Sequence, residues 1–164
     1  MARRDPELAR LERGRVASAQ WRPGKLEFRS MATRQTTLLP EMELQAWAQT
    51  LLPPARETLQ RLQQRALSST PAQLELAVQE HLQAVKAAQR RNEFIDLERA
   101  QALAESAHKL IQALDTLTPQ ARIVAAAAVL YFVTPNDAED DLGSSVGFDD
   151  DGEVLDSALT HLGL

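Results

Sequence analysis

The chain has 164 residues, no cysteine and a formal net charge of -5 at pH 7. This length suits one domain plus a tail, and a domain of about 120 residues buries well over half of the surface that its unfolded chain exposes. The absence of cysteine excludes disulfides, thiolate metal sites and cysteine nucleophiles, and it fits a reducing, cytoplasmic location.

The composition predicts an all-α fold. Leu, Ala, Gln, Glu and Arg dominate, aromatic residues make up 4% of the chain, and β-branched residues are scarce outside one central run. We therefore expect an irregular bundle of about six helices around one buried apolar helix. The longest apolar run has 11 residues, 123–133. A membrane-spanning helix needs about 20, so we expect none.

The charges divide the chain into a basic start and an acidic end. Residues 1–37 hold nine Arg or Lys against four Asp or Glu, a net charge of +5, whereas residues 135–164 hold nine acidic residues and no Arg or Lys. The basic segment has no sustained apolar stripe, so we expect a disordered arm over residues 1–37. A single helical domain is predicted for residues 38–164.

Aromatic residues stand among cations in the basic arm. This composition is typical of proteins that bind single strands by base stacking and phosphate contacts. It predicts binding to nucleic acid or to another anionic surface through a specific group of side chains: Trp21, Arg22, Lys25, Phe28 and Arg29. An arginine-rich arm that binds nothing is the alternative.

Two helices are predicted before the first capping motif. The first begins at Pro40 and ends before Pro53-Pro54, because a proline ring cannot join a continuing helix. The second covers residues 55–68. Spacings of three and four give each an apolar face, with Met42, Leu44, Trp47, Leu51 and Leu52 on the first and Ala55, Leu59, Leu62, Ala66 and Leu67 on the second.

The third and fourth helices have clearer boundaries. Thr70-Pro71-Ala72-Gln73 combines an N-cap hydroxyl, a proline at the first helical position and a capping-box glutamine, so a helix starts there and runs to about Arg91. The next helix starts near residues 94–96. Its broad apolar face comprises Leu97, Ala100, Leu103, Ala104, Ala107, Leu110, Ile111 and Leu114.

The fifth helix is the predicted centre of the fold. Thr118-Pro119 caps it in the same way, and residues 123–133 have no polar face. Such a helix must be enclosed on every side. Tyr131 lies near its end, where a buried hydroxyl needs a partner, and an Asp from the following acidic turn is the expected one.

The acidic segment after this helix offers a candidate metal site. Asp150-x-x-Glu153 has the spacing of a capping box and predicts a short final helix. Carboxylates drawn together by a turn are suitable ligands for Ca²⁺ or Mg²⁺, although the spacing does not fit an EF-hand. The candidate ligands are Asp137, Glu139, Asp140, Asp141, Asp150 and Asp151. The alternative is structural, since residues 149–153 stand where a helix N-terminus attracts negative charge.

The same segment resembles a known family. The residues that carry the resemblance are Tyr131, Pro135, Asp137, Asp141, Gly147, Phe148, Asp150 and Asp151. They match the pattern of the YkvA-like family, a bacterial domain of unknown function, and the resemblance covers residues 118–164. It implies a buried helix that ends in an aromatic residue, with Tyr131, Pro135, Gly147 and Phe148 as structural positions. It implies no activity.

We find no nucleophile–base pair, metal signature or phosphate loop in the sequence. The leading hypothesis is a small non-enzymatic interaction protein, an adapter or accessory protein of the YkvA-like type whose partner is another protein. Two alternatives stay open: binding of nucleic acid or an anionic surface through the arm, and a metal-binding or metal-dependent hydrolytic role for the acidic turn. The sequence does not indicate an oligomeric state.

Overall fold

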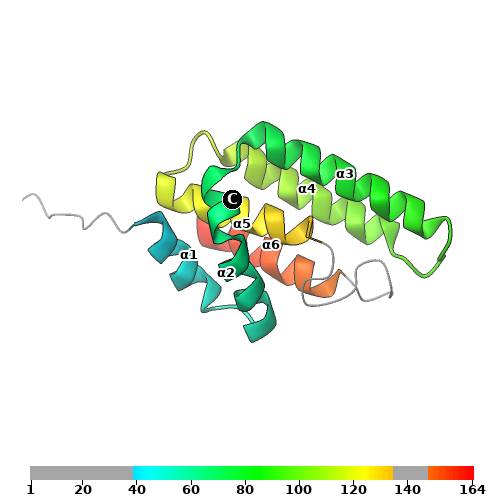
Figure 1. The fold of residues 1–164 in the computed structure, drawn as a ribbon, viewed down its shortest axis with the longest axis horizontal. Coiled ribbons are helices and arrows are strands. Elements are labelled where there is room, and N and C mark those ends of the chain that lie inside the picture. The colour runs from blue at the N-terminus through cyan, green and yellow to red at the C-terminus, as the bar shows by residue number, and fades with distance from the viewer. Residues whose placement is uncertain (1–38, 135–147) are drawn as a thin grey trace, which may run out of the picture. The chain divides into compact units, whose positions relative to one another are not determined.

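The computed structural model of the chain describes residues 39–134 and 148–164, which belong to one compact unit. Every regular element in these residues is a helix, so the predicted all-α class is confirmed. The six helices of the described residues are α1 (Pro40–Ala48), α2 (Pro53–Ser68), α3 (Pro71–Gln89), α4 (Leu97–Ala113), α5 (Pro119–Phe132) and α6 (Asp149–Leu162) (Figure 1).

Proline and threonine fix where several helices begin. Thr70 and Gln73 form the predicted capping box at the start of α3, and the Thr118 hydroxyl accepts a hydrogen bond from the Ala121 amide at the start of α5. The second helix begins at Pro53, two residues earlier than predicted. Proline is tolerated there because the first-turn amides of a helix have no intrahelical partner.

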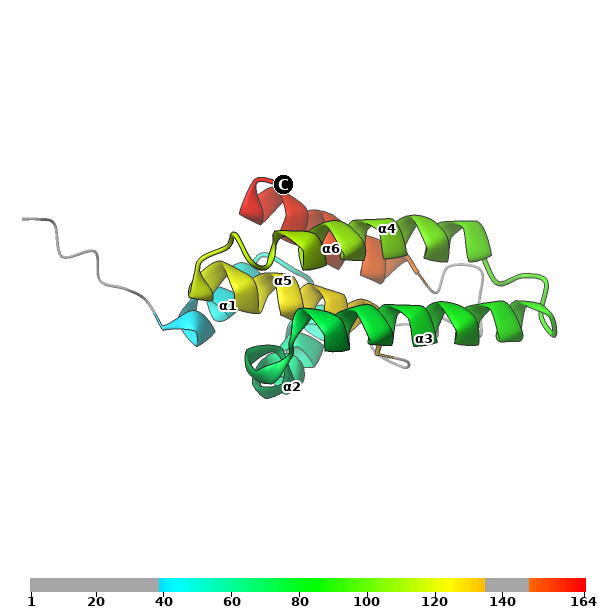
Figure 2. The same ribbon diagram turned by 90° about the horizontal axis from the view of Figure 1, so that it is seen from above.

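Helix α5 is the centre of the bundle. It contacts each of the other five helices, and it lies between them in both views (Figures 1 and 2). Every residue from Ile123 to Phe132 is buried, as predicted from its apolar sequence. Four consecutive alanines, at positions 125–128, keep the middle of this helix thin, so neighbouring helices pack close to its backbone.

Helices α3 and α4 run side by side in opposite directions (Figures 1 and 2). Two side-chain contacts join α1 to α6 across more than 100 residues of sequence. The Trp47 indole donates a hydrogen bond to Ser157 Oγ at 3.0 Å, and His161 Nε2 lies 2.9 Å from Glu43 Oε1. These contacts hold the first helix of the bundle against the last.

Three predicted core residues are exposed instead. Met42 and Leu67 are 49% and 41% exposed, and Leu52 is 60% exposed. Helix α1 ends at Ala48, so Leu52 lies beyond it in the extended N-cap position of α2. Met42 lies in the first turn of α1 and Leu67 in the last turn of α2, and both remain at the surface.

Length and hydropathy both argue against a transmembrane helix in the described part of the chain. Within residues 39–134 and 148–164, none of the helices combines the length and the apolar character that crossing a bilayer requires.

Candidate functional site

The C-terminal end of α5 meets the start of α6 at a polar contact. The Tyr131 hydroxyl donates a 2.6 Å hydrogen bond to Asp150 Oδ2, and the Tyr131 side chain is fully buried. A hydrogen bond to an ionised carboxylate is stronger than one between neutral groups. The sequence correctly predicted an Asp partner for this hydroxyl: Asp150 comes from the first turn of α6, whereas the predicted acidic turn lies outside the described residues.

The predicted capping box at Asp150 and Glu153 is wrong. Phe148 occupies the N-cap position of α6, and no side chain caps this helix. Asp150 therefore lies inside the first turn, where its carboxylate accepts the hydrogen bond from the Tyr131 hydroxyl. Asp149 and Asp151 share that turn, and the positive end of the helix dipole favours all three acids. Asp151 is completely buried.

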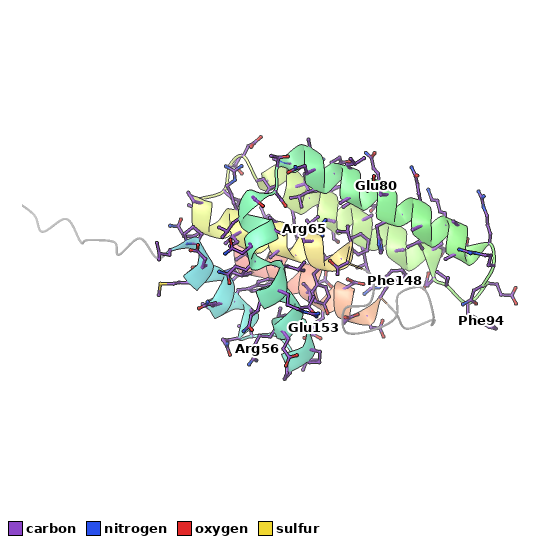
Figure 3. All side chains as sticks on the ribbon, viewed as in Figure 1. Arg56, Arg65, Glu80, Phe94, Phe148 and Glu153 are labelled. Atoms are coloured by element: carbon purple, nitrogen blue, oxygen red, sulfur yellow. The ribbon has the colours of Figure 1, made fainter. Side chains whose placement is uncertain are left out.

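A histidine and two phenylalanines pack beside this contact. The His81 ring lies edge-on to Phe132, with ring centroids 4.8 Å apart, and to Phe148 at 6.4 Å. Figure 3 shows Phe148 where α6 begins. Burial lowers the pKa of His81 below its ordinary value of 6.5, because the charged form loses hydration there. His81 Nε2 has no hydrogen-bond partner among the described residues.

Sequence reasoning missed His81 as a buried residue. Its position in α3 is three residues after Val78 and four before Val85, both of which are fully buried. That spacing was the signal that could have found it.

Gly152 allows α4 to approach α6. A Cβ atom built at Gly152 would lie 2.2 Å from Arg99 Nη2 and 3.7 Å from a methyl carbon of Leu103. The Arg99 guanidinium therefore lies directly against Gly152 in the first turn of α6. This end of α5 is closed by packing and by the hydrogen bond from Tyr131 to Asp150.

The candidate metal ligands fall into two groups. Asp150 and Asp151 are in the first turn of α6, where Asp150 bonds Tyr131. Asp137, Glu139, Asp140 and Asp141 lie outside the described residues. The described part of the chain brings together no group of three or more His, Asp or Glu side chains suited to hold a metal ion. The Ca²⁺ or Mg²⁺ site stays a prediction.

The remaining predicted positions are also divided. Tyr131 and Phe148, the two described members of the structural motif, are both buried at the α5–α6 junction. Pro135 and Gly147 lie outside the described residues. So do the arm residues proposed to bind nucleic acid, Trp21, Arg22, Lys25, Phe28 and Arg29.

The N-terminal end of α5 has a different character, because it opens onto an apolar hollow. The hollow has a volume of about 340 Å³ and lies among the ends of four helices, α1, α2, α4 and α5. Its apolar lining includes Pro40, Ala66, Leu67, Leu114, Ile123 and Ala126. Ala66, Leu114, Ile123 and Ala126 are buried and form its floor.

Large apolar side chains are exposed on two of the segments that line this hollow. Leu67 lines it directly, and Leu39 and Met42 lie in the same turn as its lining residue Pro40. These three are among the seven large apolar side chains that the structure shows exposed in the described residues. We call the hollow and these three side chains the apolar groove. Apolar surface gathered in this way is typical of interaction sites.

Sequence reasoning placed Met42 and Leu67 in the core, so it missed the groove. Helical spacing assigns a residue to an apolar face but does not say whether another helix of the same chain covers that face. Four helix ends that are distant in sequence form the groove, and no local pattern brings them together.

The lining of the groove is mostly apolar. Its lining consists of apolar side chains together with Ser69 and one charged residue, Arg122. It offers an apolar side chain a place to enter and one cation at the edge. Comparison of the chain with protein-family models, with curated proteins and with solved structures finds no match.

Proposed function

We propose that this chain is a non-enzymatic protein-interaction module that docks a partner protein in the apolar groove. The observation that carries the proposal is the hollow at the N-terminal end of α5, which the exposed Leu67 lines and whose lining residue Pro40 belongs to a turn that also exposes Leu39 and Met42. Apolar side chains of a partner that enter such a hollow lose their contact with water, and this contributes about 25 cal/mol per Å² of buried apolar surface.

The shape of the groove favours a protein segment as the ligand. Its apolar surface extends beyond the hollow to the first turn of α1, through Leu39 and Met42. A small molecule would fill the hollow of about 340 Å³ and leave these side chains exposed. A partner helix laid across a groove covers both, because its apolar side chains recur every three or four residues.

Affinity purification with matched variants tests this function. We expect a partner protein to co-purify from native lysate with the 164-residue chain. The double variant Met42→Gln/Leu67→Gln should recover about tenfold less of that partner, since each change removes about half of the 1.4 kcal/mol that tenfold represents. Binding of the purified partner to both proteins then gives the affinity.

The control is the double variant Leu52→Gln/Leu76→Gln, which changes two leucines that are 60% and 55% exposed and do not line the hollow. It should retain the partner. Equal recovery of every co-purifying protein by the groove variant and by the control would contradict docking in this groove.

The other hypotheses stay predictions. Nucleic-acid binding rests on the arm, and metal binding rests mainly on residues 137–141, so both depend on segments outside the described residues. Membership of the YkvA-like family also stays a prediction.

A further inference from the structure

The charges around the apolar groove indicate the chemistry of its partner. Arg122 is the only charged residue among those described as lining the hollow. Its side chain is 46% exposed, and its one ion pair with a described residue is with Asp115, at 3.9 Å. That distance is too long for a hydrogen bond, and the Asp115 side chain is 86% exposed, so the pair is weak. The guanidinium has donors to offer a ligand.

A second arginine lies on the other side of Ser69. Arg65 lines a neighbouring hollow of about 270 Å³, and Ser69 lines both hollows. Arg65 is exposed and is the only charged lining residue of this second hollow among those described. Figure 3 shows it near the end of α2. Two cations therefore flank the corner between α2 and α3, and no carboxylate of the described residues lines either hollow.

The start of α5 adds to this positive character. The first turn of α5 contains no acidic residue, and Pro119 and Arg122 of this turn both line the hollow. The N-terminus of a helix carries a partial positive charge. Arg122 and the α5 N-terminus thus contribute positive potential at the hollow, and Arg65 contributes it at the neighbouring hollow.

We infer that the groove takes an acidic amphipathic segment of a partner protein, an inference that rests on the docking function proposed above. Apolar side chains of the segment enter the hollow, and an Asp or Glu of the segment pairs with Arg122. The planar guanidinium matches a carboxylate with two parallel hydrogen bonds. A basic segment of equal hydrophobicity would bring like charges together and is rejected.

Selection from a displayed random peptide library tests the inference with the full chain as bait. We expect the enriched peptides to combine apolar residues at spacings of three and four with Asp or Glu. A synthetic copy of an enriched peptide should bind about tenfold or more weakly to the Arg122→Glu variant, because a charge-assisted pair becomes a like-charge contact. The Arg122→Gln variant should give a smaller loss in the same direction.

Two further variants separate this inference from the docking function. Arg91→Glu reverses an exposed charge that does not line the groove and should leave peptide binding unchanged. Met42→Gln/Leu67→Gln should weaken binding whatever the charge of the peptide. Circular dichroism of each variant verifies that it is folded.

The possible outcomes differ in what they overturn. Peptides that need Met42 and Leu67 but lack acids, or that bind Arg122→Glu as well as wild type, overturn the acidic partner and leave the docking function in place. A groove-dependent dimer of the chain, seen as a concentration-dependent mass that Met42→Gln/Leu67→Gln abolishes, makes a second copy the occupant and also overturns the inference. Failure to select any peptide that is sensitive to the groove variant contradicts both proposals.

Discussion

The two ends of α5 differ in how completely the rest of the chain covers them. At the C-terminal end, Tyr131 and Phe132 are fully buried, and a hydrogen bond from Tyr131 to Asp150 joins α5 to α6. At the N-terminal end, Ile123 and Ala126 form the floor of a hollow that other helices of the chain leave open. One apolar helix thus supplies a closed core contact at one end and the floor of an open hollow at the other.

This difference shows that polarity alone does not locate function. The cluster of acidic residues in the sequence predicted a functional site near the closed end. In the described residues, however, Asp150 of this cluster has a structural role, because it accepts the hydrogen bond from Tyr131. The open end carries no unusual sequence motif. Changes at the closed end should therefore alter the stability of the fold, whereas changes at the open end should alter binding alone.

The largest effect is expected from Phe132→Ala. The change leaves a cavity beside His81 at a fully buried position, and it should lower the free energy of unfolding by about 3–5 kcal/mol. Urea denaturation measures it. Gln101→Ala, at an exposed position of α4, is the control and should be nearly neutral. A loss below about 1 kcal/mol would show that this end of α5 is not closely packed.

Tyr131→Phe should have the next largest effect. It removes the hydroxyl that donates a hydrogen bond to Asp150 Oδ2. We expect the free energy of unfolding to fall by about 1–3 kcal/mol, with the helical content unchanged. Thermal unfolding of Tyr131→Phe, Asp150→Asn and the double variant forms a double-mutant cycle. Additive losses, or an unchanged melting temperature in Tyr131→Phe, would contradict a coupling between these residues.

His81 should make stability depend on pH. Its pKa is lowered in the folded state by burial, so below about pH 6.5 the unfolded chain binds more protons at this position than the folded chain. Acidification from pH 7.5 to 5.5 should then reduce the free energy of unfolding, with a slope of at most about 1.4 kcal/mol per pH unit from this one group.

The His81→Leu variant should lose that part of the slope. Denaturation curves at several pH values measure it. Gln83→Leu, at an exposed position of the same helix, is a suitable control because it removes no titratable group. Equal slopes in wild type and His81→Leu would contradict the assignment of this pH dependence to His81.

The smallest effect on stability is expected at the open end. Leu67→Gln should change the free energy of unfolding by no more than about 0.5 kcal/mol, because the side chain is already 41% exposed. The same denaturation assay measures it. A loss as large as that of Tyr131→Phe would mean that Leu67 supports the fold, and the contrast between the two ends of α5 would disappear.

The sequence predicted the elements that depend on local physics. Thr70-Pro71 and Thr118-Pro119 mark helix starts because capping needs only neighbouring residues, and the apolar run of α5 indicated an enclosed helix. The start of α6 was misplaced because Asp150 hydrogen-bonds to Tyr131, 19 residues earlier in the chain. Met42 and Leu67 were predicted to be buried but are exposed. Their helical spacing is the same as that of core residues, so the sequence does not distinguish the two.

The position of α5 also governs how the bundle opens. Each other helix packs on α5, so the core that the five helices share is lost once α5 leaves. Backbone amides of α5 should therefore exchange with deuterium only when the whole domain unfolds, whereas amides at the short helix α1 exchange through local opening. A partner bound in the groove would contact α1 and should slow the deuterium exchange of the α1 amides. Comparing the exchange of free and partner-bound chain would therefore locate the groove.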